Sequence, residues 1–146
     1  MASLYNSEGY FSPTEYEAVS RIEREERAAE KFAAFRPIVY ICSPYSHGCI
    51  NTNIENARKY SRFAVDKHYL PITPHIYFTQ FMDDTVSEER ETAVFMNFVL
   101  MSKCVELLVF GDIISAGMKA EIERAERKHM KIRYFTEELE EKKCEI

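Results

Sequence analysis

A carboxylate and several small polar residues follow one apolar run, and they form the strongest chemical signal in the chain. The apolar residues 105–110 predict a buried strand that stops at Gly111 and Asp112, and Ser115 predicts the N-cap of a helix. At about 100° per residue, Glu121 lies on the flank of the buried stripe of that helix. Because open α/β sheets bind ligands beyond the carboxyl ends of their strands, Glu121 is the carboxylate best placed to face a pocket.

A second polar segment follows the predicted strand at residues 37–42. This loop leads into a helix expected to begin near residues 51–53 and to end near residue 68. Its polar side chains belong to Ser43, Tyr45, Ser46 and His47. Free N–H groups at a helix N-terminus favour anions, so the loop is a potential phosphate or sugar site. It matches neither a Walker A loop nor G-x-G-x-x-G, and a solvated loop histidine is an equal alternative for His47.

His75 follows the second predicted strand, at residues 69–74, and shares a loop with Asp83 and Asp84. These three residues could bind a metal or a ligand. No spacing typical of a metal site supports the metal, so a histidine that packs or forms hydrogen bonds in the loop is the favoured interpretation.

The next predicted helix, residues 87–102, is apolar on nearly every side. It is expected to be deeply buried or shared with another subunit. Asn97 lies in its middle, and a buried amide must find hydrogen-bond partners. Asn97 therefore either satisfies the local backbone or faces the pocket.

These segments belong to a regular alternation of helices and strands. An amphipathic helix over residues 13–35 begins with a capping box at Ser12 and Glu15. A last strand is predicted at residues 131–135 and a short charged helix at residues 136–143. Alternation of this kind predicts a parallel sheet wrapped by helices.

Composition limits the classes of function. With 146 residues, 46% hydrophobic and 13% aromatic, the chain fits one folded domain. A net charge of −5 gives no basic surface for duplex nucleic acid, which favours a small ligand. The four cysteines lack zinc-binding spacing, and neither a signal peptide nor a membrane-spanning stretch is evident. We therefore expect no metal, no membrane partner and a cytoplasmic location.

Several motifs, in order, resemble one family. They are YICSPYSHG, N-x-x-x-A-R, TPHIYFTQFMDD-x-x-x-x-ER and MNFVLMSKCVELLVFGDIISAGMKAEIERA. Together they resemble the nucleoside 2-deoxyribosyltransferase-like superfamily and its DUF4406/DUF7768-type branch, which is common in phage and mobile-element genes. The resemblance covers residues 37–135. It implies a Rossmann-like, flavodoxin-like α/β domain at residues 37–146, a three-layer sandwich with four to five mostly parallel strands, and an N-terminal extension at residues 1–36 that carries the added helix.

The resemblance also implies a chemistry. Enzymes of this superfamily cleave an N-glycosidic bond through a glutamate nucleophile after a Ser/Gly-rich turn, and this residue falls on Glu121. The preceding helix carries Asn97 where family enzymes have an aspartate. Asp112 would orient a sugar hydroxyl or Glu121, although a turn residue is an equal alternative. The expected ligand-binding residues are Ser43, Pro44, Tyr45, Ser46, His47, His75, Asn97, Ser115, Gly117 and Met118, with no cofactor required.

Three functions stay open at this point. The first is an N-glycosidase or deoxyribosyltransferase-like enzyme acting on a nucleoside or nucleotide. The second is a protein that binds and sequesters a nucleotide signal without turnover, which Asn97 favours because an amide is neither an acid nor a base at neutral pH. The third is an oligomeric scaffold with a vestigial pocket. A homo-oligomer is expected, because the superfamily often completes its pocket from a neighbouring subunit.

Overall fold

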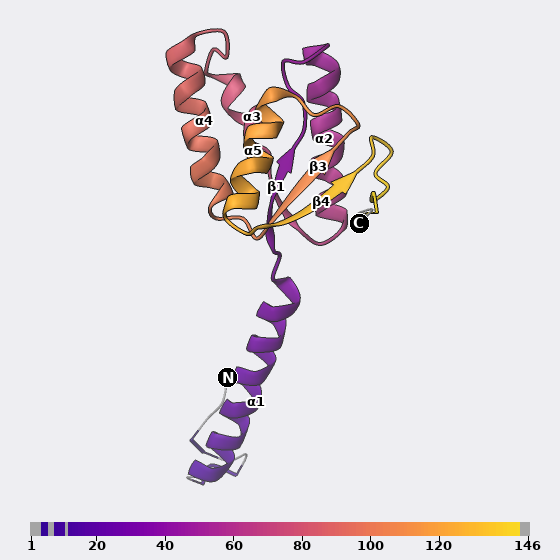
Figure 1. Ribbon diagram of the computed structural model, residues 1–146. Helices are drawn as coiled ribbons and strands as arrows, with labels where there is room; N and C mark the ends of the chain where they lie inside the picture. The colour runs from indigo at the N-terminus through magenta and orange to yellow at the C-terminus, as the bar shows by residue number, and fades with distance from the viewer. Residues whose placement is uncertain (1–3, 6–7, 11, 144–146) are drawn as a thin grey trace. The chain divides into compact units, whose positions relative to one another are not determined.

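The computed structural model describes residues 4–5, 8–10 and 12–143, and it divides the chain into two units (Figure 1). The units are Met1–Phe35 and Arg36–Ile146. The first contains helix α1 (Pro13–Ala34), with Pro13 in its first turn as the sequence predicts. Ser12 is the N-cap of α1, but its side chain makes no capping hydrogen bond, so the predicted capping box is wrong in this respect.

The second unit is built on a four-stranded parallel sheet. Its strands are β1 (Ile38–Cys42), β2 (Leu70–Ile72), β3 (Glu106–Phe110) and β4 (Lys131–Phe135), in the order β2-β1-β3-β4. All three pairings are parallel, so the carboxyl ends of the strands meet at one edge of the sheet. The prediction of a parallel sheet is confirmed.

Helices cover both faces of this sheet (Figure 1). They are α2 (Ile50–Asp66), the short α3 (Pro74–Tyr77), α4 (Ser87–Met101) and α5 (Ala116–Arg127), and a 3₁₀ turn (Phe78–Gln80) follows α3. Successive side chains of a strand point to opposite faces, so β1 contributes to two cores. Tyr40 and Cys42 pack toward α4 and α5, in a cluster that includes Met101 and Met118. The other cluster contains Val39, Ile41, Leu108 and Phe110 of the sheet with Tyr60 and Ala64 of α2.

Two predicted details of secondary structure are wrong. Residues 136–143 form a turn and not a helix, because Glu141 makes an antiparallel bridge with Phe135 and the Lys142 N–H donates to Tyr134 O at 2.8 Å. Leu139 in this turn has a φ of 70°, which a right-handed helix does not allow. The segment after β2, expected to be a loop, contains α3 and the 3₁₀ turn.

No helix in the described part of the chain has both the length and the apolar character needed to cross a bilayer.

The aromatic stack in the core between the sheet and α2 generates a stability prediction. The Phe110 ring lies 4.3 Å from the Tyr60 ring and 5.0 Å from the Phe135 ring, centroid to centroid, and Phe110 is fully buried. Phe110→Ala leaves a cavity in this core, so we expect the free energy of unfolding to fall by about 3–5 kcal/mol in urea titrations. Ile113→Ala, at a residue with 57% exposure, is the control and should change it by no more than about 0.5 kcal/mol. Equal effects of both substitutions would contradict this account of the core.

Candidate functional site

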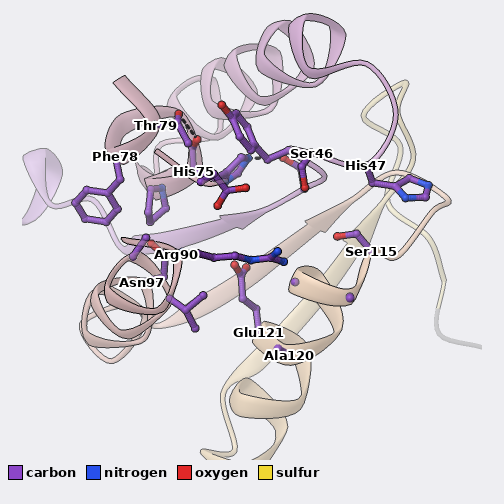
Figure 2. Close-up of a pocket in the computed structure, with 18 of the residues that line it drawn as sticks. Ser46, His47, His75, Phe78, Thr79, Arg90, Asn97, Ser115, Ala120 and Glu121 are labelled. Atoms are coloured by element: carbon purple, nitrogen blue, oxygen red, sulfur yellow. Dashed lines mark hydrogen bonds between the residues drawn. The ribbon is translucent and has the colours of Figure 1, made fainter. Parts of the chain in front are cut away.

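A cavity of about 390 Å³ opens beyond the carboxyl ends of the strands (Figure 2). Its walls come from four parts of the chain: the loop after β1, the segment after β2, α4, and the first turns of α5. Those parts contribute Ser43, Tyr45, Ser46 and His47; Pro74, His75, Phe78, Thr79 and Asp84; Arg90, Ala93, Val94, Asn97 and Phe98; and Ser115, Ala116, Gly117, Ala120 and Glu121.

Glu121 is fixed by both its helix and its strand neighbour. On α5, Met118 and Ile122 are buried against the sheet, which places Glu121 on the flank of the buried stripe, facing the cavity. The Ser115 side chain accepts a hydrogen bond from the Met118 N–H at 3.3 Å, so the predicted N-cap of α5 is confirmed. From β1, the Tyr40 hydroxyl donates to Glu121 Oε1 at 3.2 Å. Two secondary-structure elements therefore orient one carboxyl group.

The environment of Glu121 shifts its protonation equilibrium. Burial raises its pKa to about 7, while hydrogen bonds from Cys42 and Tyr40 act in the opposite direction because they stabilise the charged form. Burial and the neighbouring Glu121 also raise the pKa of Tyr40 well above its ordinary value, so this phenol keeps its proton and remains a donor. Near neutral pH, Glu121 is therefore present both as a carboxylate and as an acid.

His75 is partly buried against Ser43 on the wall formed by the segments after β1 and β2. Ser43 Oγ and His75 Nε2 lie 2.9 Å apart, and Ser43 is only 7% exposed. Burial lowers the pKa of His75 to about 4, so the imidazole is neutral at physiological pH. The Thr79 hydroxyl donates to His75 O at 2.7 Å and holds the turn in place. His75 can accept or donate a hydrogen bond here, but it carries no charge.

The loop after β1 is held by a side chain of α2. Asn53 Nδ2 donates to Tyr45 O and to His47 O, both at 2.7 Å. Gly48 completes the loop with a φ of 84°, a conformation that favours glycine. The N-cap of α2 is Cys49, so Asn53 supports the loop instead of capping the helix. This network positions Ser43, Tyr45, Ser46 and His47 along the cavity.

Asn97 lines the opposite side of the cavity on α4. Its Oδ1 atom is buried and has no hydrogen-bond partner among the described residues. A buried acceptor without a partner is costly, and the cavity is the space from which a donor could reach it.

Three residues predicted for the site do not line this cavity. Gly111, with a φ of 92°, starts the turn after β3, and the Asp112 side chain that follows is 79% exposed and pairs with Lys142 Nζ at 3.0 Å. Met118 is 2% exposed and belongs to the core. Pro44 borders a separate cavity of about 70 Å³.

Other wall residues were not expected from the sequence. Arg90 extends from α4 toward the space in front of Glu121 (Figure 2). It stands seven residues before Asn97, two turns along one face of a helix, and this spacing is the signal that could have found it. Tyr40 could have been found from the alternation of β1, because it lies on the same face as Cys42. Two aromatic side chains, Phe78 and Phe98, also belong to the wall.

No group of three or more His, Cys, Asp or Glu side chains in the described part of the chain is arranged to hold a metal ion.

Comparisons with known proteins identify a family for this chain and a solved structure with a similar fold. The family model "Domain of unknown function (DUF7768)" matches residues 37–135. A solved structure of a 2-deoxyribosyltransferase from the psychrotolerant bacterium Bacillus psychrosaccharolyticus is similar, with a TM-score of 0.56 and 13% identity over 68% of this chain and 72% of that one. The predicted Rossmann-like, flavodoxin-like fold is confirmed by this likeness. No curated protein matches the chain.

The link between Tyr40 and Glu121 generates a prediction about protonation. In a carbon-13 NMR titration of labelled glutamate, we expect the Glu121 carboxyl to titrate near pH 7. Tyr40→Phe removes a hydrogen-bond donor that stabilises the charged form of Glu121. The pKa of Glu121 should therefore rise further in this variant, by about one unit. Glu121→Gln identifies the resonance, and Glu123, exposed on the same helix, is the internal control. An unchanged Glu121 pKa in Tyr40→Phe would show that this hydrogen bond does not influence the carboxyl group.

Proposed function

The chain belongs to the DUF7768 family of domains of unknown function, and from the geometry of the cavity we propose that it is an enzyme that cleaves an N-glycosidic bond of a nucleoside or nucleotide. The observation that carries the proposal is Glu121, a largely buried carboxyl group that faces the cavity and is oriented by the Tyr40 hydroxyl. The likeness to a 2-deoxyribosyltransferase supports the proposal through its fold. We also propose that the chain is related to the nucleoside 2-deoxyribosyltransferase-like superfamily through its DUF4406/DUF7768-type branch. In this proposal, residues 37–146 form the catalytic domain.

In this mechanism the ionised Glu121 attacks the anomeric carbon. A carbon–oxygen bond forms, the carbon–nitrogen bond breaks, and its electron pair leaves with the base. Water or a second base then attacks the same carbon and releases Glu121 as a carboxylate. Breaking the bond develops positive charge on the sugar, and the nearby carboxylate stabilises that charge. No step requires a metal ion or another cofactor.

The wall residues have complementary tasks in the proposal. Ser43, Tyr45, Ser46 and His47 would contact the sugar and any phosphate along the loop after β1, together with Ser115 and Gly117 at the start of α5. His75 and Asn97 would form hydrogen bonds to the remaining parts of the ligand. Asp112 and Pro44 would act only through the turns that they form, and Met118 through its packing beneath Glu121.

We also propose that the protein forms a homo-oligomer in the cytoplasm. Helix α4 exposes Val94, Phe95 and Val99, with 41%, 68% and 46% of their surfaces accessible. Exposed apolar residues on one helix are typical of a subunit interface. Cys42, Cys49 and Cys104 are free thiols, which fits a reducing compartment.

The catalytic proposal predicts a reaction that depends on Glu121. Purified protein is incubated with ribo- and deoxyribonucleosides and their nucleotides, and free base is measured by chromatography with mass detection. Glu121→Gln should reduce base release at least about 1,000-fold, because an amide cannot serve as the nucleophile. Release by the wild type should increase with pH through about 7, since the ionised form of Glu121 reacts.

Glu123→Gln is the matched control for this experiment, because Glu123 lies on the same helix and is exposed outside the cavity. It should release base at the wild-type rate. Bound, intact nucleotide without base release would contradict catalysis and favour a sequestering protein. Neither binding nor release would favour a scaffold. Activity that falls above pH 7 would assign Glu121 the role of an acid in place of a nucleophile.

The oligomer proposal predicts that Phe95→Glu lowers the molar mass in solution. A charge placed in an apolar interface must be desolvated, so the substituted chain should dissociate in light-scattering measurements after size-exclusion chromatography. Glu55→Lys, an exposed charge change on α2 at the other face of the sheet, is the control and should leave the mass unchanged. A monomeric wild-type protein would contradict the proposal.

A further inference from the structure

Cleavage of an N-glycosidic bond can require a proton donor on the cavity wall, depending on the charge of the base that leaves. When a neutral nucleobase leaves, the electron pair of the broken bond would make it an anion, which departs slowly unless an acid protonates it. A base that is already a cation leaves as a neutral molecule and needs no proton. The proton donors available on the wall therefore select the substrate class.

The wall facing Glu121 is poor in groups that can give up a proton. Asn97 carries an amide, which does not ionise. His75 is partly buried and neutral, and its Nε2 atom lies within hydrogen-bond distance of Ser43 Oγ. Arg90 keeps its proton under all physiological conditions. Asn97 and Arg90 could bind a leaving base, but neither could protonate it.

Three further ionisable side chains line the cavity, and they belong to Tyr45, His47 and Asp84. The His47 side chain points away from Glu121, at the opposite end of the cavity from Asn97 (Figure 2). Asp84 is the remaining carboxyl group on the wall besides Glu121 among the described residues. It sits in the turn that Asp83 holds through hydrogen bonds from the Thr85 N–H and hydroxyl at 2.9 and 2.6 Å.

The same wall suits an aromatic cation. Phe78 and Phe98 line the cavity beside Asn97, and the faces of aromatic rings attract cations. The Arg124 guanidinium already occupies one face of Phe98, 5.0 Å from the ring centroid. Asn97 Oδ1 is buried without a partner and would accept a hydrogen bond from an amino or carboxamide group on the ring. The described wall carries two acidic side chains, Glu121 and Asp84, against the one guanidinium of Arg90, so acidic groups outnumber the cation that would repel a cationic base.

From this arrangement we infer that the site acts on N-glycosides whose base is already a cation, such as an N-ribosyl pyridinium or an N7-alkylated purine nucleoside. The inference rests on the proposed function. Glu121 bonds to the anomeric carbon, and the electron pair of the carbon–nitrogen bond neutralises the departing base. Water then displaces Glu121, adding hydroxide to the sugar and releasing one proton to solvent. Each turnover thus yields sugar, neutral base and one proton.

A matched pair of substrates tests the inference on the unmodified protein. Guanosine and N7-methylguanosine, with their 2′-deoxy counterparts, differ by one methyl group and one positive charge. We expect base release from the methylated member to be at least about 100-fold faster, because general acid catalysis is worth roughly that factor and is missing here. Release by Glu121→Gln is subtracted to remove spontaneous loss of the base. Glu123→Gln should match the wild type on both substrates.

Asn97→Asp gives an independent readout. It places a carboxyl group where the wall has an amide, so release from the neutral nucleoside should rise at least about tenfold while release from the methylated one does not rise. A purely structural role for Asn97 would not produce this selective gain.

Two outcomes would overturn the inference, and they are distinguishable. Equal wild-type rates on both members of the pair would retain the N-glycosidase and reject the preference for cations. Dependence of release from the neutral nucleoside on Asp84, measured with Asp84→Asn, would identify an acid on the wall and lead to the same rejection. Base release from none of these compounds would reject the proposed function as well.

Discussion

The parallel pairing of β1 with β3 is the constraint on which the site depends. It brings Cys42 opposite Val109, so both strands end at the same edge of the sheet and the chain that follows each must turn there. The loop after β1 and the start of α5 consequently form adjacent walls of one cavity. Strand pairing thus brings together two segments that are more than 60 residues apart in the chain.

The same pairing determines what Glu121 contacts. Side chains alternate along β1, so Tyr40 points toward α5 while Val39 and Ile41 point toward α2. Met118 and Ile122 anchor α5 on that face, and the carboxyl group between them meets the Tyr40 hydroxyl. Burying this carboxyl group disfavours its charged form, and one phenol and one thiol offset only part of that effect. Because its pKa is raised to about 7, the charged form of Glu121 lowers the stability of the folded protein. Shifted pKa values of this kind cluster at functional sites.

The sequence predicts the sheet and the position of Glu121 well, because both follow from local patterns. Short β-branched runs bounded by turn residues locate strands, and the helical period places Glu121 beside the buried Met118 and Ile122. Asp112 shows the limit of this reasoning: adjacency to a strand end does not fix a direction, and the turn at Gly111 brings its side chain to Lys142. That partner lies 30 residues away, in a segment predicted to be helical, so no local pattern could have revealed the pair. Arg90 was missed for a different reason: its spacing from Asn97 is a local signal, but a charged residue in the first turn of a helix is ordinarily solvated.

Fold similarity alone cannot decide what the cavity does, because one α/β architecture supports many reactions. The chemistry must follow from the groups on the wall. Glu121 supplies a carboxylate near neutral pH, and His75 contributes hydrogen bonds without charge because its burial against Ser43 is not offset by any carboxylate partner. Asn97 differs from both, since its buried oxygen has no partner within the described chain. Under the proposed function, the unpaired Asn97 oxygen would hold the base of the ligand, and the carboxyl group that Tyr40 orients would react at its sugar.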